Sequence, residues 1–160
     1  MESPEYYLAG CAIGPGQGHE TGRELLAALY REVTGENLPP IAIGHRGKPD
    51  FAHSQWHFSI THTPKHVFCA LARSPIGIDA EEADRQIDLR LARKILSPNE
   101  KRQFDAAGDQ RLALLIFWVL KEAEGKRTGE GINGWPSKTD FSLDDPRVQE
   151  KDGCLLAVMM

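Results

Sequence analysis

Two acidic clusters indicate that this chain combines a strand and a helix around one group of side chains. The first cluster ends an apolar, β-favouring run, so Asp79 and Glu81 are expected to point to one face of a strand. The second closes a helical run in which Trp118, Glu122 and Lys126 recur every four residues and share one stripe. The sequence therefore predicts three carboxylates and a lysine near the meeting point of the two elements.

These side chains suit a divalent cation and a phosphate. Proteins hold Mg²⁺ through one or two carboxylates, while water and substrate phosphates complete its octahedral shell. Asp79, Glu81 and Glu122 supply carboxylates, and Lys126 supplies a cation for a phosphate. Taken alone, each cluster is more often a solvated strand edge or an exposed, salt-bridged helix face, so the metal hypothesis depends on the context of both.

Composition excludes several classes of protein. The chain has 160 residues, of which 41% are hydrophobic and 26% charged, as expected for one globular domain. A net charge of −4 gives no basic excess, so we expect no nucleic-acid partner. The chain shows neither a basic signal-like start nor a long apolar run, so we expect a cytoplasmic protein with no membrane segment.

The cysteines and histidines do not form a recognisable metal or disulfide pattern. Cys11, Cys69 and Cys154 are widely spaced, which disfavours a disulfide framework and suits a reducing compartment. The histidines between residues 45 and 66 lack a closed four-ligand spacing, so we do not expect zinc.

Apolar periodicity and turn residues predict an α+β fold. We expect strands over residues 6–13, 41–43, 57–61, 67–72, 76–81, 139–143 and 155–159. We expect helices from a capping box at Thr21 to Gly35, over residues 89–96, after an N-cap at Ser97, and over residues 109–126. Gly125 is unfavourable inside a helix, so the last helix is expected to end there and to present Lys126 from its terminus.

Four ordered blocks resemble the 4′-phosphopantetheinyl transferases, of the larger Sfp-like class. They lie at residues 47–49, 58–63, 75–81 and 118–126. Each block alone is a weak signal, but their order and spacing fit the family from about Thr21 onward. The segment before Thr21 is shorter than in typical members, so some adenine contacts are expected to be missing or rebuilt.

The resemblance implies an architecture and a reaction. The architecture is a pseudo-dimer of two α+β halves, approximately residues 1–74 and 75–160, with the active site in their cleft. The reaction transfers the 4′-phosphopantetheine arm from coenzyme A to a serine of an apo carrier protein, which is a holo-carrier-protein synthase activity. It implies Mg²⁺ as cofactor, an apo acyl or peptidyl carrier protein as partner, and a monomer.

The resemblance also implies roles for individual residues. Asp79, Glu81 and Glu122 match the family's metal-binding acids. Glu122 is the candidate base for the incoming serine, and Asp79 and Lys126 complete the catalytic set. The coenzyme A contacts are expected at the following positions: Arg23, Lys48, Thr61, His62 and Lys126.

Two other functions are also compatible with these residues. One is a degenerate module that binds coenzyme A or a carrier protein without transfer, which the intact acidic clusters disfavour. The other is a Mg²⁺-dependent phosphohydrolase of coenzyme A, which would need no carrier protein. The choice of carrier protein lies in surface details that sequence patterns do not identify.

Overall fold

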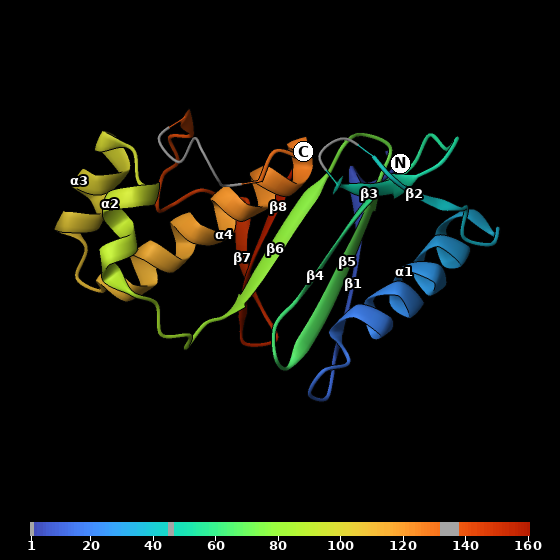
Figure 1. Cartoon of the computed structure of the whole chain (residues 1–160), viewed down its shortest axis with the longest axis horizontal. Helices are drawn as coiled ribbons and strands as arrows, with labels where there is room; N and C mark the ends of the chain where they lie inside the picture. The colour runs from blue at the N-terminus through green and yellow to red at the C-terminus, as the bar shows by residue number, and fades with distance from the viewer. Residues whose placement is uncertain (1, 45–46, 132–137) are drawn as a thin grey trace.

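The structure is a computed structural model, and it describes residues 2–44, 47–131 and 138–160. The fold is α+β, as expected, with two antiparallel three-stranded sheets and a small two-stranded hairpin (Figure 1). The first part of the chain contains β1 (Tyr6–Ala12), α1 (Gly18–Thr34), β2 (Ile41–Ile43), β3 (Pro49–Phe51), β4 (His57–His62) and β5 (His66–Ala72). The second part contains β6 (Gly77–Glu82), the 3-10 turn η2 (Leu89–Leu91), α2 (Ala92–Ile95), α3 (Pro98–Ala106), α4 (Gln110–Thr128), β7 (Val148–Lys151) and β8 (Cys154–Met159).

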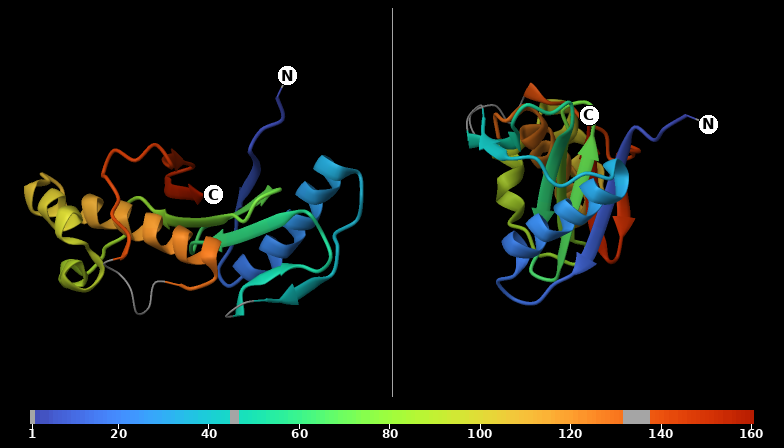
Figure 2. Two further views of the ribbon diagram at one scale, coloured as in Figure 1. Left: turned by 90° about the horizontal axis from the view of Figure 1, so that it is seen from above. Right: turned by 90° about the vertical axis from the view of Figure 1, so that its right-hand side faces the viewer.

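The two three-stranded sheets share one topology. In the first sheet β5 lies between β1 and β4, and in the second β8 lies between β6 and β7. In both, an edge strand leads into a long helix, and the chain returns through the other edge strand to the central strand. Figures 1 and 2 place α1 and the pair of α2 and α3 at opposite ends of the long axis, with the sheets between them.

Strand alternation buries both faces of the central strands. On β5, Phe68 and Ala70 join an apolar cluster with residues of the second sheet, whereas Leu71 packs with α1. On β8, Leu156 joins the shared cluster and Ala157 packs with α4. Because consecutive residues of a strand point to opposite faces, each central strand contacts a helix on one side and the other sheet on the other.

The sheets also meet at their edges, where hydroxyl groups of β4 accept hydrogen bonds from backbone amides of β6. Ser59 Oγ accepts from the Ile78 N–H at 3.0 Å, and Thr61 Oγ1 accepts from the Ala80 N–H at 3.3 Å. The two hydroxyls are two residues apart on β4, so they face the same side. This junction brings Asp79, which lies between the two bonded amides, to the boundary of the two sheets.

Helix boundaries differ from expectation at two places. Gln17 is the N-cap of α1, so Thr21 lies inside the helix and the expected capping box there is wrong; the expected C-cap at Gly35 is confirmed. Helix α4 continues through Gly125 to Thr128, so its expected end is also wrong. A Cβ at Gly125 would lie 2.8 Å from the Gly131 carbonyl carbon, so glycine allows the following loop to approach the helix.

The predicted strand at residues 139–143 is not formed. Phe141 and Leu143 instead pack against the α3 and α4 region, so their alternation reflects burial beside helices and not strand pairing. The third strand of the second sheet is β7, which was not predicted, and neither was β3. The expected helix over residues 89–96 is divided into η2 and α2. Across the described ranges, none of the helices combines the length and apolar character needed to span a membrane.

Candidate active site

A cavity of about 360 Å³ lies between α1, β4 and α4. Several residues predicted from the sequence line it: Arg23, Lys48, His62, Glu122 and Lys126. They come from α1, the segment before β3, the end of β4 and the last turns of α4. The fold therefore brings together side chains that are distant in the sequence, and most of those side chains are basic.

Asp79 is buried next to Lys126. Its Oδ1 accepts from Lys126 Nζ at 3.1 Å and from Thr61 Oγ1 at 3.4 Å, and the residue is only 7% exposed. Its Oδ2 is buried and has no hydrogen-bond partner among the described residues. A buried carboxylate oxygen without a partner has lost its hydration without compensation. Asp79 thus retains the capacity to bind one more positively charged or hydrogen-donating group.

The pKa values of the three acids show how unfavourable their negative charges are here. Burial raises the pKa of Asp79 to about 6, although the neighbouring Lys126 lowers it. Burial and the charge of Asp79 raise the pKa of Glu81, and burial with a contribution from Glu81 raises that of Glu122. A divalent cation relieves this kind of mutual repulsion, so the residues present fit such an ion.

Arg85 is a part of this group that the sequence analysis missed. Its Nη1 lies 2.5 Å from Glu81 Oε1, and its guanidinium lies 5.9 Å from the centroid of a Trp118 ring. Its positive charge partly offsets the rise in the pKa of both Glu81 and Glu122. Arg85 stands four residues after Glu81, but it follows a turn, where spacing does not predict direction.

Thr61 and His62 are adjacent but occupy different environments. Thr61 is 4% exposed, and its hydroxyl is engaged with Ala80 and Asp79. His62 is exposed and lines the cavity, and its ring lies against Gly18 at the start of α1. A Cβ at position 18 would come within 2.5 Å of the His62 Cγ, so glycine leaves room for this ring.

Lys48 is held at the cavity by the end of α4. Its Nζ donates to the Arg127 carbonyl oxygen at 3.0 Å. Burial lowers the pKa of Lys48, and the charge of Arg127 acts in the same direction, while Asp50 opposes them. The contact places an ammonium group at the rim of the cavity.

Lys121 has a different role from the other residues of its block. Its Nζ lies 2.7 Å from Glu100 Oε1 and 2.6 Å from Thr139 Oγ1, and both charged side chains are fully buried. The Glu100 carboxylate also accepts hydrogen bonds from the backbone N–H groups of Ser97 and Phe141. The interpretation of an exposed helix face is therefore wrong for Lys121, which ties α4 to α3 and to the segment before β7.

Comparison with known proteins identifies the family of this chain. A family model described as the 4′-phosphopantetheinyl transferase superfamily matches residues 75–155, which include the acidic clusters of both β6 and α4. The 4′-phosphopantetheinyl transferase gsp of Aneurinibacillus migulanus is 34% identical over 120 residues, covering 64% of this chain and 50% of the relative. The transferase psf-1 of Bacillus pumilus is 35% identical over 117 residues, covering 72% of this chain and 46% of the relative.

A third relative is named for the same activity. The 4′-phosphopantetheinyl transferase Sfp of Bacillus subtilis (strain 168) is 33% identical over 79 residues, covering 48% of this chain and 35% of the relative. The chain spans about half the length, or less, of these curated relatives. The family match and these relatives together show that this chain belongs to the 4′-phosphopantetheinyl transferase superfamily and is of the Sfp-like class.

Proposed function

We propose that this chain transfers the 4′-phosphopantetheine arm of coenzyme A to a serine of an apo carrier protein. The observation that carries the proposal is Asp79, a buried carboxylate with one oxygen on Lys126 and the other unpartnered among the described residues. It stands beside a cavity with several cationic side chains, as an anionic coenzyme requires. The activity for which the relatives are named points to the same reaction. Their names fit the Sfp-like type better than the holo-acyl-carrier-protein synthase type.

Asp79, Glu81 and Glu122 are the proposed ligands of Mg²⁺. When bound, the ion would supply positive charge to the pyrophosphate of coenzyme A. Asp79 offers its unpartnered Oδ2, and Glu122 lines the cavity from α4. Arg85 partly neutralises Glu81, so the charge of the acidic group is moderated before an ion binds.

Lys126 and Glu122 are the side chains proposed to act directly on the reacting groups of the substrates. The serine oxygen forms a bond to the phosphorus of the phosphopantetheine arm, and the bond from that phosphorus to adenosine 3′,5′-bisphosphate breaks. Lys126 stabilises the negative charge that accumulates on the pyrophosphate oxygens. Glu122 accepts the serine proton on its carboxylate, and burial raises its pKa in the direction that makes it a stronger base.

Arg23, Lys48 and His62 are proposed to bind coenzyme A in the cavity. Their support is their position, because all three line the cavity that also contains Lys126. Direct contact of Thr61 with the coenzyme stays a prediction, since its hydroxyl also supports Asp79 from the β4 side.

We further propose a pseudo-dimer of two halves, approximately residues 1–74 and 75–160, that acts as a cytoplasmic monomer without a nucleic-acid or membrane partner. The repeated topology of the two sheets supports the pseudo-dimer. The free thiols of Cys11, Cys69 and Cys154 suit a reducing compartment.

Intact-mass spectrometry of apo acyl and peptidyl carrier proteins tests the reaction. Each carrier is incubated with the protein, coenzyme A and Mg²⁺, with EDTA as the control. A gain of one phosphopantetheine arm that EDTA abolishes is the expected result. If calorimetry detects bound coenzyme A but no carrier gains mass, the chain is a binding module; if coenzyme A is hydrolysed without a carrier, it is a phosphohydrolase.

A further inference from the structure

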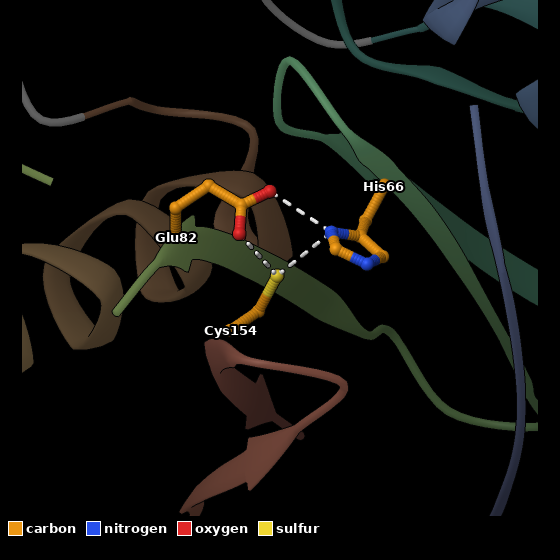
Figure 3. Close-up of side chains that lie close together, drawn as sticks. All are labelled: His66, Glu82 and Cys154. Atoms are coloured by element: carbon orange, nitrogen blue, oxygen red, sulfur yellow. Dashed lines mark hydrogen bonds and ion pairs between the residues drawn. The ribbon is translucent and has the colours of Figure 1, made fainter. Parts of the chain in front are cut away.

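Three side chains of different chemistry converge on the face of β6 opposite to Asp79. His66 begins β5, Glu82 ends β6 and Cys154 begins β8. Figure 3 shows the imidazole, the carboxylate and the thiol pointing toward one another. Glu82 and Cys154 are paired residues in the register of β6 and β8, so their side chains stand on the same face. His66 reaches them from the other sheet.

The distances between the three groups approach those of a tetrahedral metal site. Cys154 Sγ lies 3.5 Å from His66 Nδ1 and 3.5 Å from Glu82 Oε2, and the His66 Nδ1 lies 2.9 Å from Glu82 Oε1. Around zinc, with bonds of about 2.3 Å to sulfur and 2.0–2.2 Å to nitrogen and oxygen, such ligand pairs lie about 3.3–3.6 Å apart. The two distances to sulfur already match. The 2.9 Å contact joins His66 Nδ1 to the other carboxylate oxygen, Oε1, so the imidazole and the carboxylate must move apart for one ion to bind between them.

The donor set selects zinc over magnesium, although the spacing of the histidines in the sequence alone does not predict a zinc site. Imidazole nitrogen, carboxylate oxygen and thiolate sulfur are the three donors that proteins offer to Zn²⁺, whereas Mg²⁺ prefers oxygen alone. The side chains of His66 and Glu82 are 19% and 15% exposed, so water can reach a fourth position. Thr63 Oγ1 donates to Glu82 Oε1 at 2.7 Å and orients the carboxylate, as outer residues do at metal sites.

We propose that His66, Glu82 and Cys154 bind one Zn²⁺, with water as the fourth ligand, and so fasten β5 of the first sheet to β6 and β8 of the second. Binding forms a zinc–sulfur bond, releases the thiol proton of Cys154 to solvent and changes no oxidation state. The imidazole binds through Nδ1, so the proton that Nδ1 donates to Glu82 Oε1 in the metal-free protein is given up and the bound neutral ring carries its proton on Nε2. The site goes beyond the proposed transfer reaction and does not depend on it.

Cobalt substitution tests this site directly. The metal-free protein is titrated with Co²⁺ and then with Zn²⁺, and zinc affinity is measured by competition with a chelating dye. We expect one thiolate-bound Co²⁺ per chain, seen as a thiolate-to-cobalt charge-transfer band, and displacement of this ion by Zn²⁺; any Co²⁺ at the proposed Mg²⁺ site gives no such band. Cys154→Ser should remove the band, and both Cys154→Ser and His66→Gln should weaken zinc binding at least about tenfold, because even changes of supporting residues typically weaken metal binding by about 10–100-fold.

Two matched variants separate this site from other thiols and from the acidic group. Cys11→Ser removes a thiol that lies outside the cluster, and Asp79→Asn alters the proposed Mg²⁺ site. Both should keep the charge-transfer band and the zinc affinity.

The proposal is overturned if the wild-type protein shows no charge-transfer band, or if a folded Cys154→Ser or His66→Gln variant binds zinc as tightly as wild type. Circular dichroism checks the fold of each variant. Cys154 is fully buried. If its variant does not fold, His66→Gln, at a partly exposed side chain, decides the question.

Discussion

Helix α4 carries two lysines that each pair with a carboxylate from another element, and the two pairs differ in what surrounds them. Lys121 and Glu100 are 2.7 Å apart and both fully buried, and the oxygens of Glu100 also accept backbone amides. Lys126 and Asp79 are 3.1 Å apart, the Lys126 side chain is 35% exposed, and Asp79 Oδ2 lacks a partner among the described residues.

The difference separates a structural pair from the pair that is proposed to act in the reaction. A buried pair whose hydrogen-bonding groups are largely satisfied holds three segments together and offers little to a ligand. A pair with an unsatisfied oxygen and access to a cavity can exchange or add partners when a ligand arrives. Both lysines belong to one sequence block, so only their surroundings distinguish them.

The largest effect is expected for Asp79→Asn, which removes the charge of the incomplete pair. Carrier modification should fall by about 10³-fold or more, because a proposed metal ligand and the partner of Lys126 are both altered. Initial rates measured by intact-mass spectrometry give the effect, and circular dichroism should show an unchanged fold. An undiminished rate would remove Asp79 from the active site.

Breaking the complete pair should act on stability instead. Lys121→Met leaves the Glu100 carboxylate buried without its cation, which should lower the free energy of unfolding by about 3–5 kcal/mol. Urea denaturation measures this change. The matched control is Lys101→Met, which breaks an exposed pair with Asp105 and should change stability by less than about 0.5 kcal/mol. Equal effects for the two variants would contradict the structural role of Lys121.

Lys126→Met should have the opposite pattern to Lys121→Met, with a large loss of turnover and little loss of stability. Turnover should decrease by about 10²–10³-fold, because the variant loses the proposed stabilisation of charge on the pyrophosphate. The free energy of unfolding should change by less than about 1 kcal/mol, because the side chain is partly exposed and Asp79 can take up a proton. A destabilisation as large as that of Lys121→Met would mean that the two pairs have the same role.

The smallest expected effect is a pH dependence that originates in Asp79. Burial raises the pKa of Asp79 to about 6, above about 3.9 in an unfolded chain, so the folded state binds this proton more tightly. The resulting stabilisation is fully present below about pH 4 and is lost as pH rises through about 6, an amount of up to about 3 kcal/mol.

Urea denaturation in EDTA, compared between wild type and Asp79→Asn, isolates this contribution. Burial raises the pKa of Glu81 and Glu122 in the same direction, but both acids remain in the variant. The stability of Asp79→Asn relative to wild type should therefore increase between pH 4 and pH 7. A constant difference across this range would show that the Asp79 carboxyl titrates normally.

Many of the elements could be predicted because their signals are local. Ser97 is an N-cap as expected, where it forms a capping box with Glu100, and the apolar runs of β5 and β8 are strands. Caps and periodicity act between residues a few positions apart, so they are readable without a fold. The strand predicted over residues 139–143 is wrong because Phe141 is an apolar residue that packs against helices and not in a sheet.

The sequence by itself determined the chemical types of the candidate site: acids on a strand, and an acid with a lysine on a helix. It could not determine that Arg85 meets Glu81, that Lys121 is buried, or that Asp79 has an unpartnered oxygen. The cluster of His66, Glu82 and Cys154 joins residues up to 88 positions apart, with ligands on three strands. Burial and pairing depend on neighbours from other elements, and those neighbours exist only once the sheets have packed together.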